Sequence, residues 1–350
     1  MRIGVIGCGY WGSKHVRVLH ALEAVEDVVA VDPRPDRLKE LQRGFPRLQT
    51  FEQIDDALDH VDAFVIATPP ETHAPLALTA MQAGKSVLIE KPLATSTQDA
   101  RMLAQVADHM GVVLGVGHTF EYNSAVWKLR DLLESGELGR VHYIDSARLN
   151  LGLYQSDVNV IWDLAPHDVS ICNYILRSTP TKVEAWGSRH SHSFLEDVAY
   201  IRLTYDNPRV TAFIHVSWLD PRKVRRTTIV GSSKMAVYND LAADERVRVY
   251  DKGVVLANDL PALAQMPMSY RVGDIQSPFL TFEEPLLVQD REFAACVATG
   301  QRPPTDVDNG IAVVQALEAA EISLRVGRPV HISETEMRLG LAEELKELTA

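Results

Sequence analysis

Short apolar runs alternate with helical stretches over the first third of the chain. The apolar runs lie at 3–6, 27–31, 61–67, 86–89 and 112–116, and the segments at about 74–83 and 97–110 predict helices. Strands that are apolar on both faces and are joined by helices form a parallel sheet covered on both sides. Ligands bind such sheets at the carboxyl ends of the strands. The pattern therefore predicts an α/β domain with a Rossmann fold over residues 1–120.

The pattern changes in the second part of the chain. A helix at 123–135, which Gly136 ends, precedes longer segments in which apolar and polar residues alternate. Such segments lie at 141–150, 198–205, 210–218 and 224–230. Turn residues at 206–208 and 231–233 favour hairpins between neighbouring strands. Residues 121–350 therefore predict an α+β domain built on a large, mostly antiparallel open sheet.

An open sheet has one wide face that needs cover. Helices near 162–176 and 310–326 would supply part of that cover. A partner subunit would supply the rest, so we expect a homodimer or homotetramer formed through the C-terminal sheet.

Length, charge and cysteine content narrow the class of protein. At 350 residues the chain is longer than one core usually serves, which agrees with two domains. The net charge of −12 argues against broad affinity for nucleic acid or anionic membranes, although it allows a local basic pocket. Cys8, Cys172 and Cys296 have the spacing of neither a disulfide framework nor a zinc site. No apolar run approaches the roughly 20 residues of a membrane span and no leader pattern is present, so we expect a cytoplasmic protein.

A glycine-rich motif joins the first predicted strand to the first predicted helix. Gly7, Gly9 and Gly12 permit a tight turn, close approach of backbone N–H groups to a pyrophosphate, and tight packing of the helix. Tyr10 and Trp11 lie between the last two glycines. The motif in this context predicts the phosphate site of a dinucleotide cofactor.

An acidic residue, Asp32, ends the second apolar run and follows Gly12 by 20 positions. Its carboxylate could accept hydrogen bonds from both adenosine ribose hydroxyls and would repel a 2′-phosphate, which predicts NAD as the cofactor. Asp32 could instead only begin the turn 32–35, a role that aspartate often fills. Arg37 could stack near the adenine or pair with a 2′-phosphate, so NADP stays open.

Two polar motifs follow later strands, at the predicted ligand edge. Thr68, Pro69 and His73 follow the fourth strand, and Glu90 and Lys91 follow the fifth. Each motif also has a purely structural explanation, since Thr-Pro can form a turn, histidine can begin a helix, and Lys-Pro is usually part of a loop. Their place at the ligand edge favours a role in cofactor binding.

A third motif lies at the head of an apolar helix, where His167 follows Asp163 by four residues. Pro166 suits the first turn of that helix. The positive end of the helix would favour the neutral form of His167, which can serve as a base. Alternatively, Asp163 caps the helix and His167 is an ordinary buried residue. No set of residues has convincing metal-ligand spacing, so we expect no metal.

The glycine-rich turn at 7–12, the sequence Glu90-Lys91-Pro92 and the Asp163/His167 pair together resemble the Gfo/Idh/MocA oxidoreductase family over nearly the whole chain. The resemblance implies an NAD(P)-binding domain followed by a substrate-binding and oligomerisation domain. It also implies that Lys91, Asp163 and His167 face the nicotinamide and the reacting carbon.

The resemblance implies a division of roles among these three residues. His167 would accept the hydroxyl proton while hydride leaves the same carbon, and Lys91 would stabilise the developing alkoxide. Asp163 would orient His167 or relay protons. The predicted cofactor contacts are Gly7, Gly9, Tyr10, Trp11, Gly12, Asp32, Arg37, Thr68, Pro69, His73, Glu90 and Lys91.

The segment 148–168 is similar to family members that act on nucleotide-linked sugars, including UDP-N-acetylglucosaminuronate 3-dehydrogenases and 3-ketosugar reductases. Arg148 could equally be a solvated strand residue. The predicted substrate contacts are Lys91, Asn123, Arg148, Asn150, Tyr154, Asn159, Asp163 and His167.

The sequence therefore predicts an NAD-dependent oxidoreductase that acts on a secondary hydroxyl or ketone of a pyranose, nucleotide-linked and at C3. One alternative is a free-sugar or inositol dehydrogenase. Another is a non-catalytic NAD(P)-binding regulator, against which the retention of Lys91, Asp163 and His167 argues. Glycoside hydrolysis through a closed redox cycle is a further alternative.

Overall fold

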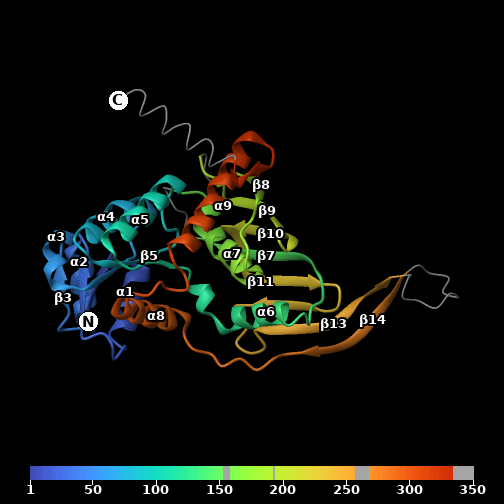
Figure 1. The fold of residues 1–350 in the computed structure, drawn as a ribbon, viewed down its shortest axis with the longest axis horizontal. Coiled ribbons are helices and arrows are strands. Elements are labelled where there is room, and N and C mark those ends of the chain that lie inside the picture. The colour runs from blue at the N-terminus through green and yellow to red at the C-terminus, as the bar shows by residue number, and fades with distance from the viewer. Residues whose placement is uncertain (153–157, 192–193, 257–267, 334–350) are drawn as a thin grey trace. The chain divides into compact units, whose positions relative to one another are not determined.

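The computed structural model describes residues 1–152, 158–191, 194–256 and 268–333 and contains two compact units (Figure 1). The first unit comprises Met1–Tyr122 and Glu283–Glu318, and the second comprises Asn123–Phe282 and the residues from Ala319 onward. Each unit is built on one sheet, of six strands in the first and nine in the second. The predicted fold class, a Rossmann fold followed by an α+β domain, is confirmed.

The first unit holds a parallel sheet in the order β3-β2-β1-β4-β5-β6. Its strands are β1 (Arg2–Ile6), β2 (Asp27–Val31), β3 (Gln49–Phe51), β4 (Ala63–Ile66), β5 (Ser86–Glu90) and β6 (Leu114–Gly117). The helices that connect them are α1 (Tyr10–Leu19), α2 (Pro35–Gly44), α3 (Ile54–Ala57), η1 (Leu58–His60), η2 (Pro70–Thr72), α4 (His73–Gln82) and α5 (Thr97–Met110), and η3 (Thr119–Tyr122) follows β6. Because every strand runs in the same direction, the segments that follow β1, β4, β5 and β6 all begin at one edge of the sheet.

Helices cover both faces of this sheet. Helices α4 and α5 pack together on one face, and α1 packs on the other face beside α8 (Pro285–Thr299), as Figure 1 shows. The buried core between α1, α8 and the sheet includes Ile3, Val5 and Leu88. Strands β1, β2, β4, β5 and β6 are buried almost throughout, which is why their sequences are almost continuously apolar.

Helix α8 and the residues up to Glu318 belong to the first unit, although the sequence pattern places one boundary after residue 120. The reason is apolar packing: Phe293 and Ala294 of α8 are both 1% exposed and join the core formed by α1 and the sheet. Burying one phenylalanine side chain contributes roughly 1.5–3 kcal/mol. The unit boundary falls within α9 (Val307–Val326).

The second unit holds a mixed sheet in the order β14-β13-β12-β11-β7-β10-β9-β8-β15. Its strands are β7 (Val141–Leu151), β8 (Lys182–Ser188), β9 (Val198–Asp206), β10 (Arg209–Ser217), β11 (Leu219–Gly231), β12 (Met235–Asn239), β13 (Val247–Leu256), β14 (Met268–Gln276) and β15 (Val330–His331). Strands β7 and β10 pair in parallel, and every other neighbouring pair is antiparallel. The hairpins predicted at 206–208 and 231–233 are confirmed, between β9 and β10 and between β11 and β12.

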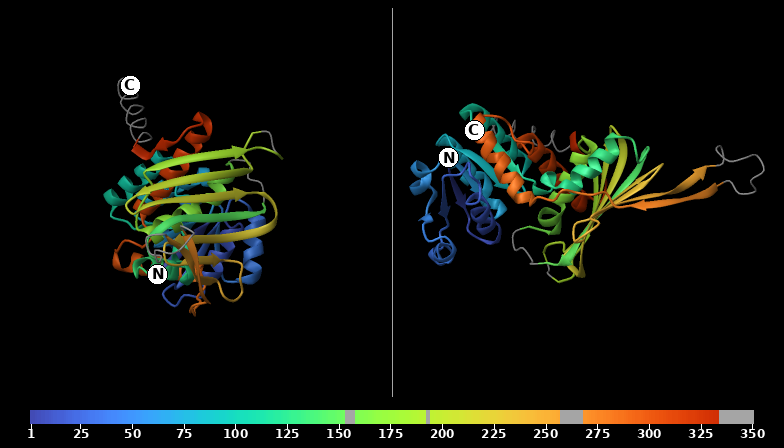
Figure 2. Two further views of the ribbon diagram at one scale, coloured as in Figure 1. Left: turned by 90° about the vertical axis from the view of Figure 1, so that its right-hand side faces the viewer. Right: turned by 90° about the horizontal axis from the view of Figure 1, so that it is seen from below.

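One face of the second sheet is covered by helices. Helix α7 (Val160–Leu176) packs on β7, β9 and β10, and α6 (Ser124–Glu134) packs on α7, β12 and β13. The opposite face carries Tyr143, Trp186, Tyr200 and Phe213, which are 41–53% exposed. Figure 2, left, shows this face without a covering helix among the described residues. The sheet is therefore covered on one side only within the described chain.

Candidate cofactor and catalytic site

The glycine-rich turn follows β1 and leads directly into α1. The amide of Gly7 donates to the carbonyl of Val31 at 2.8 Å, and Gly7 has a φ of +87°, in the left-handed region that favours glycine. A Cβ atom on Gly12 would lie 1.8 Å from the carbonyl oxygen of Gly7. The chain can pass this closely only because Gly12 has no side chain. The turn therefore has the geometry of a G-x-G-x-x-G motif, which binds a pyrophosphate at the start of the following helix, here α1.

Asp32 at the end of β2 holds this turn through two backbone hydrogen bonds. Its Oδ2 accepts from the amide of Cys8 at 2.8 Å, and its Oδ1 accepts from the amide of Arg34 at 2.9 Å. Asp32 thus does begin the turn at 32–35, and it also links that turn to the glycine-rich turn. A carboxylate has about four acceptor positions, so both oxygens keep capacity for ribose hydroxyls.

A cavity of about 390 Å³ lies beside the glycine-rich turn, lined by Cys8, Gly9, Tyr10, Ser13, Arg37, Glu40 and Leu41. The Nη1 atom of Arg37 lies 2.7 Å from the position that a Cβ on Gly9 would take. Tyr10 is 73% exposed and Trp11 is 40% exposed, with the Lys14 ammonium 4.6 Å from the Tyr10 ring centre. The open glycine backbone, an arginine and exposed aromatic rings fit the phosphates and one base of a dinucleotide.

His73 ties together the two loops that follow β4 and β5. Its Nδ1 lies 2.8 Å from the carbonyl oxygen of Pro92, and its Nε2 lies 2.9 Å from that of Thr68. Burial lowers the pKa of His73, so the neutral ring donates to one of these oxygens at a time. Thr68 is held further, since Thr72 donates a hydroxyl hydrogen bond to it at 2.7 Å. His73 therefore fixes the positions of Thr68, Pro69 and the Glu90-Lys91-Pro92 segment.

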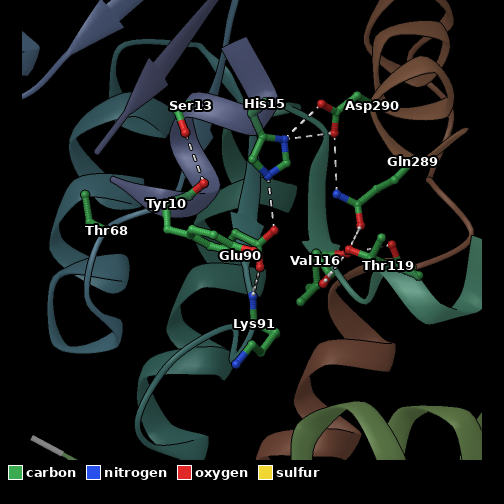
Figure 3. A network of polar contacts seen from close by, with 12 residues as sticks. Tyr10, Ser13, His15, Thr68, Glu90, Lys91, Val116, Thr119, Gln289 and Asp290 are labelled. Carbon is green, nitrogen blue, oxygen red and sulfur yellow. Dashed lines mark hydrogen bonds and ion pairs between the residues drawn. The ribbon is translucent and has the colours of Figure 1, made fainter. Parts of the chain in front are cut away.

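Figure 3 shows a buried polar network around Glu90, the last residue of β5. His15 of α1 lies between two carboxylates: Nε2 donates to Oε1 of Glu90 at 3.1 Å, and Nδ1 donates to Oδ2 of Asp290 at 2.9 Å. Burial opposes a charge on this ring, but Asp290 and Glu90 together raise the pKa of His15 to about 10. His15 is therefore an imidazolium at neutral pH.

The network continues through α8. Gln289 donates to Oδ1 of Asp290 at 3.4 Å, and Thr119 donates to the side-chain oxygen of Gln289 at 2.8 Å. Burial raises the pKa of Asp290, against the effect of His15. Neither His15 nor Asp290 is a candidate from the sequence. Although His15 follows Gly12 by three residues, its partner comes 275 residues later, and no local pattern links the two.

Lys91 is half-buried and follows Glu90 at the ligand edge. Its backbone amide donates to Oε2 of Glu90 at 3.2 Å. Burial works against the carboxylate of Glu90, but the hydrogen bond and charge of His15, followed by the charge of Lys91, lower its pKa. Glu90 is therefore ionised and faces two cations. An ammonium group at this position can donate to an oxygen that gains charge.

His118 follows β6 at the same edge and is not among the predicted cofactor or substrate contacts. Burial lowers its pKa to about 4, with Glu90 opposing and Lys91 adding to the effect. Its ring is 1% exposed, and neither nitrogen has a hydrogen-bond partner among the described residues. This neutral ring keeps a donor and an acceptor for other groups.

Asp163 and His167 both lie on α7, in the second unit. The helix begins at Val160, and the side chain of Asn159 caps it by accepting from the amides of Ile161 and Trp162 at 3.1 and 3.4 Å. The prediction that Pro166 occupies the first turn is therefore wrong, and so is the alternative in which Asp163 caps the helix. Pro166 lies inside the helix and has no N–H for the carbonyl of residue 162.

The carboxylate of Asp163 contacts Trp218, which lies between β10 and β11 of the same unit. Its Oδ2 accepts a hydrogen bond from the indole Nε1 of Trp218 at 2.8 Å. Residues four apart on a helix share a face, so Asp163 and His167 are neighbours along α7.

The predicted substrate contacts in the second unit are mostly engaged in holding that unit together. Arg148 is 4% exposed and pairs with Asp168 of α7 at 2.6 Å, so it is not a solvated strand residue. Asn123 caps α6 and donates to Tyr238 at 3.2 Å. Asn159 donates to Glu196 at 3.3 Å, besides capping α7. Asn150 on β7 is half-buried, and Tyr154 lies outside the described residues.

Two kinds of site are absent from the described part of the chain. No group of three or more His, Cys, Asp or Glu residues there could hold a metal ion. Within the same ranges, no helix is both long and apolar enough to cross a membrane.

Two family models match the chain. A model described as "Oxidoreductase family, NAD-binding Rossmann fold" matches residues 1–118, and a model of the GFO/IDH/MocA C-terminal domain matches residues 126–237. The UDP-N-acetylglucosamine 3-dehydrogenase of Acidithiobacillus ferrooxidans is 30% identical over 264 residues, which are 75% of this chain and 81% of that protein. The myo-inositol 2-dehydrogenase of Thermotoga maritima is 24% identical over 95% of this chain and 99% of its own length.

A solved structure with a bound cofactor is also similar. GenD2 from gentamicin A biosynthesis, in complex with NAD, superposes with a TM-score of 0.79 at 26% identity and covers 95% of this chain and 96% of its own. Both family models indicate the same family, and the glycine-rich turn of the first unit has the geometry that its NAD-binding domain requires. The chain therefore belongs to the Gfo/Idh/MocA family of NAD-binding oxidoreductases.

Proposed function

We propose that this protein transfers a hydride between NAD and a secondary hydroxyl or ketone of a pyranose. The observation that carries the proposal is the ligand edge of the first sheet. There the glycine-rich turn after β1 and the Glu90-Lys91 segment after β5 begin at the same side of the sheet. A parallel sheet places a dinucleotide along this edge, with its phosphates at the start of α1.

The residues of the chain supply binding and proton chemistry, and bound NAD supplies the group that accepts or returns the hydride. By the family resemblance, Lys91 donates a hydrogen bond to the oxygen of the reacting carbon and stabilises its charge as the hydride leaves. His167 takes the hydroxyl proton as a general base, and Asp163 orients its ring. Reduction of a ketone reverses these steps.

The cofactor preference follows from Asp32. Its carboxylate lies at the end of β2, where it favours the two ribose hydroxyls of NAD and repels the 2′-phosphate of NADP. Arg37 lies next to Gly9 and favours the phosphates of the cofactor. We therefore propose a preference for NAD, with Arg37 as the residue that permits NADP at lower affinity.

We propose a nucleotide-linked sugar, oxidised at C3, as the substrate. The 30% identical relative that acts on UDP-N-acetylglucosamine supports this choice. Inositol is the second candidate, because the 24% identical relative over nearly the full chain is a myo-inositol 2-dehydrogenase. Asn123, Arg148, Asn150, Tyr154 and Asn159 stay proposed residues of the substrate region, and the engaged side chains of Arg148 and Asn159 would shape it by holding α7.

The uncovered face of the second sheet supports a homodimer or homotetramer. Tyr143 and Phe213 lie edge to face with ring centres 6.5 Å apart, and Tyr200 stacks on His215 at 4.0 Å. Aromatic residues are enriched in subunit interfaces. Light scattering should show a dimer or tetramer for the wild type and a smaller species for Phe213→Arg, and a wild-type monomer at high concentration would contradict the proposal.

The substrate proposal is tested by following nicotinamide absorbance with NAD and a panel of nucleotide sugars, free sugars and inositols. Formation of NADH with UDP-linked sugars and not with inositols would support the proposed substrate class. Formation of NADH with inositol alone would select the second candidate. NAD binding without turnover in either direction would favour a regulator, and glycoside cleavage without net NADH formation would favour a closed redox cycle.

A further inference from the structure

His15 has no part in the chemistry assigned above, yet it contacts the residue next to Lys91. Its ring is completely buried and bridges Asp290 of α8 and Glu90 of β5. The second carboxylate oxygen of Glu90 accepts from the backbone amide of Lys91. A continuous series of polar contacts therefore runs from α8 through α1 to Lys91, all within the first unit (Figure 3).

The two carboxylates are balanced by two cations, His15 and Lys91, only when His15 is protonated. Two buried carboxylates then share one imidazolium, and the group keeps a single net negative charge beside the Lys91 ammonium. With a neutral ring or an amide in place of His15, two carboxylates would be buried without a cation between them. A buried carboxylate in that situation takes up a proton.

Among the described residues, several titratable groups face Glu90. His15 approaches from α1 and Asp290 from α8, while His73 begins α4 and His118 follows β6. Burial keeps His73 and His118 neutral, so neither supplies a positive charge. Lys91 is the group that Glu90 positions. Ahead of Lys91, His15 thus contributes most to keeping Glu90 ionised.

We propose that His15 is a positioning residue for the hydride transfer: clamped by Asp290, its imidazolium keeps Glu90 ionised and turned toward the Lys91 backbone. This inference rests on the proposed role of Lys91. The fixed carboxylate orients the Glu90-Lys91 segment and provides a constant negative charge beside the ammonium. His15 itself does not touch the cofactor or the substrate in this account.

The first test is the ionisation of Glu90, measured without turnover. Infrared difference spectra of the wild type against Glu90→Gln report whether Glu90 is a carboxylate or a carboxylic acid. The wild type should show a carboxylate throughout the neutral range. In His15→Gln the Glu90 carboxyl should become protonated at a pH higher by about one unit or more, since Lys91 alone then opposes the desolvation of Glu90. The double variant His15→Gln/Glu90→Gln should lack this signal.

The second test is the pH dependence of kcat. His15→Gln should lower kcat on the order of 10²-fold, as misplacement of a reacting group does, while NAD affinity stays near its wild-type value. The acid limb of its kcat profile should shift to higher pH, because Glu90 becomes protonated at a higher pH. Glu90→Gln should show low kcat without the shifted limb, because no carboxyl remains to titrate.

Two matched controls separate charge from packing. Asp290→Asn removes one of the two carboxylates that raise the pKa of His15 but leaves the ring against Glu90, so the infrared signal of Glu90 should shift less than in His15→Gln. His20→Gln makes the same substitution at the exposed C-terminal end of α1, where the ring stacks on Phe45. It should have the wild-type kcat profile. A Glu90 signal that responds equally to His15→Gln and Asp290→Asn would overturn the proposal.

The proposal stays testable if His15→Gln does not fold. A protonated Glu90 in the wild type at neutral pH would overturn it directly. If the infrared signal behaves as expected but no substrate gives turnover, the ionic role of His15 holds and the proposed function fails. If turnover is found and the acid limb of His15→Gln is unshifted, the proposed function holds and this inference fails.

Discussion

The indole Nε1 of Trp218 donates a hydrogen bond to Oδ2 of Asp163 at 2.8 Å. Trp218 is 1% exposed and lies between β10 and β11, while Asp163 is in the first turn of α7. The bond therefore fixes the carboxylate that we propose orients His167. A carboxylate held in this way can keep a neighbouring imidazole in one orientation during proton transfer.

Trp218→Phe tests this orientation because it removes the N–H group and keeps an aromatic ring. A hydrogen bond to a charged group contributes about 1.5 kcal/mol, so kcat should fall about tenfold while NAD affinity is retained. Trp162→Phe is the matched control, since Trp162 donates to Glu321 from the same helix at 2.8 Å. It should lower stability and leave kcat unchanged. Equal effects of both variants on kcat would point to general damage to α7.

Gly12→Ala tests the glycine-rich turn. The new methyl group would lie 1.8 Å from the carbonyl oxygen of Gly7, so the turn must open. NAD affinity, measured by calorimetry, should fall by at least about tenfold. Gly44→Ala is the matched control, since its methyl group would lie in open space at the end of α2. It should leave NAD affinity unchanged and change the free energy of unfolding by no more than about 1 kcal/mol. Unchanged affinity in Gly12→Ala would contradict the phosphate site.

Asp32→Asn tests the preference for NAD over NADP. The amide retains one acceptor oxygen for the amide of Cys8 or Arg34, but the negative charge is lost. NAD affinity should fall and NADP affinity should rise, so that their ratio changes on the order of tenfold or more. Titration of the variant with both cofactors measures this ratio. If neither affinity changes, Asp32 serves only to hold the two turns together.

The first unit could be predicted from the sequence because its signals are local. Strands buried on both faces must be apolar, and the close approach of Gly12 to Gly7 excludes side chains. Both requirements leave a pattern within a few residues. The alternating strands 198–205 and 210–218 were equally readable, because one face of each is buried against α7.

The parts that could not be predicted depend on contacts between distant segments. His15 gains its charge mainly from Asp290, whose helix α8 returns to the first unit only after strands β7 to β14 of the second sheet. The sequence does not show that Arg148 is buried, because its partner Asp168 lies 20 residues away on another element. The start of α7 was misplaced because Pro166 resembled a first-turn residue, whereas the cap is Asn159, seven residues earlier.

The stability of the protein should depend on pH through His15. Its pKa is about 10 in the folded protein and about 6.5 in an unfolded chain. The ion pairs therefore contribute fully below about pH 6.5, and their contribution is lost as the pH rises toward 10. Urea unfolding over this range should show the wild type losing more stability than His15→Gln, by up to about 1.4 kcal/mol per pH unit. Parallel curves would contradict a charged His15.

The most direct test of the central claim is hydride transfer in His167→Asn, measured in a single turnover with the substrate that the panel selects. We predict that the variant binds NAD with wild-type affinity and transfers hydride at least about 10²-fold more slowly, because the general base is lost. Hydride transfer at the wild-type rate in His167→Asn would contradict the assignment of His167 as the base.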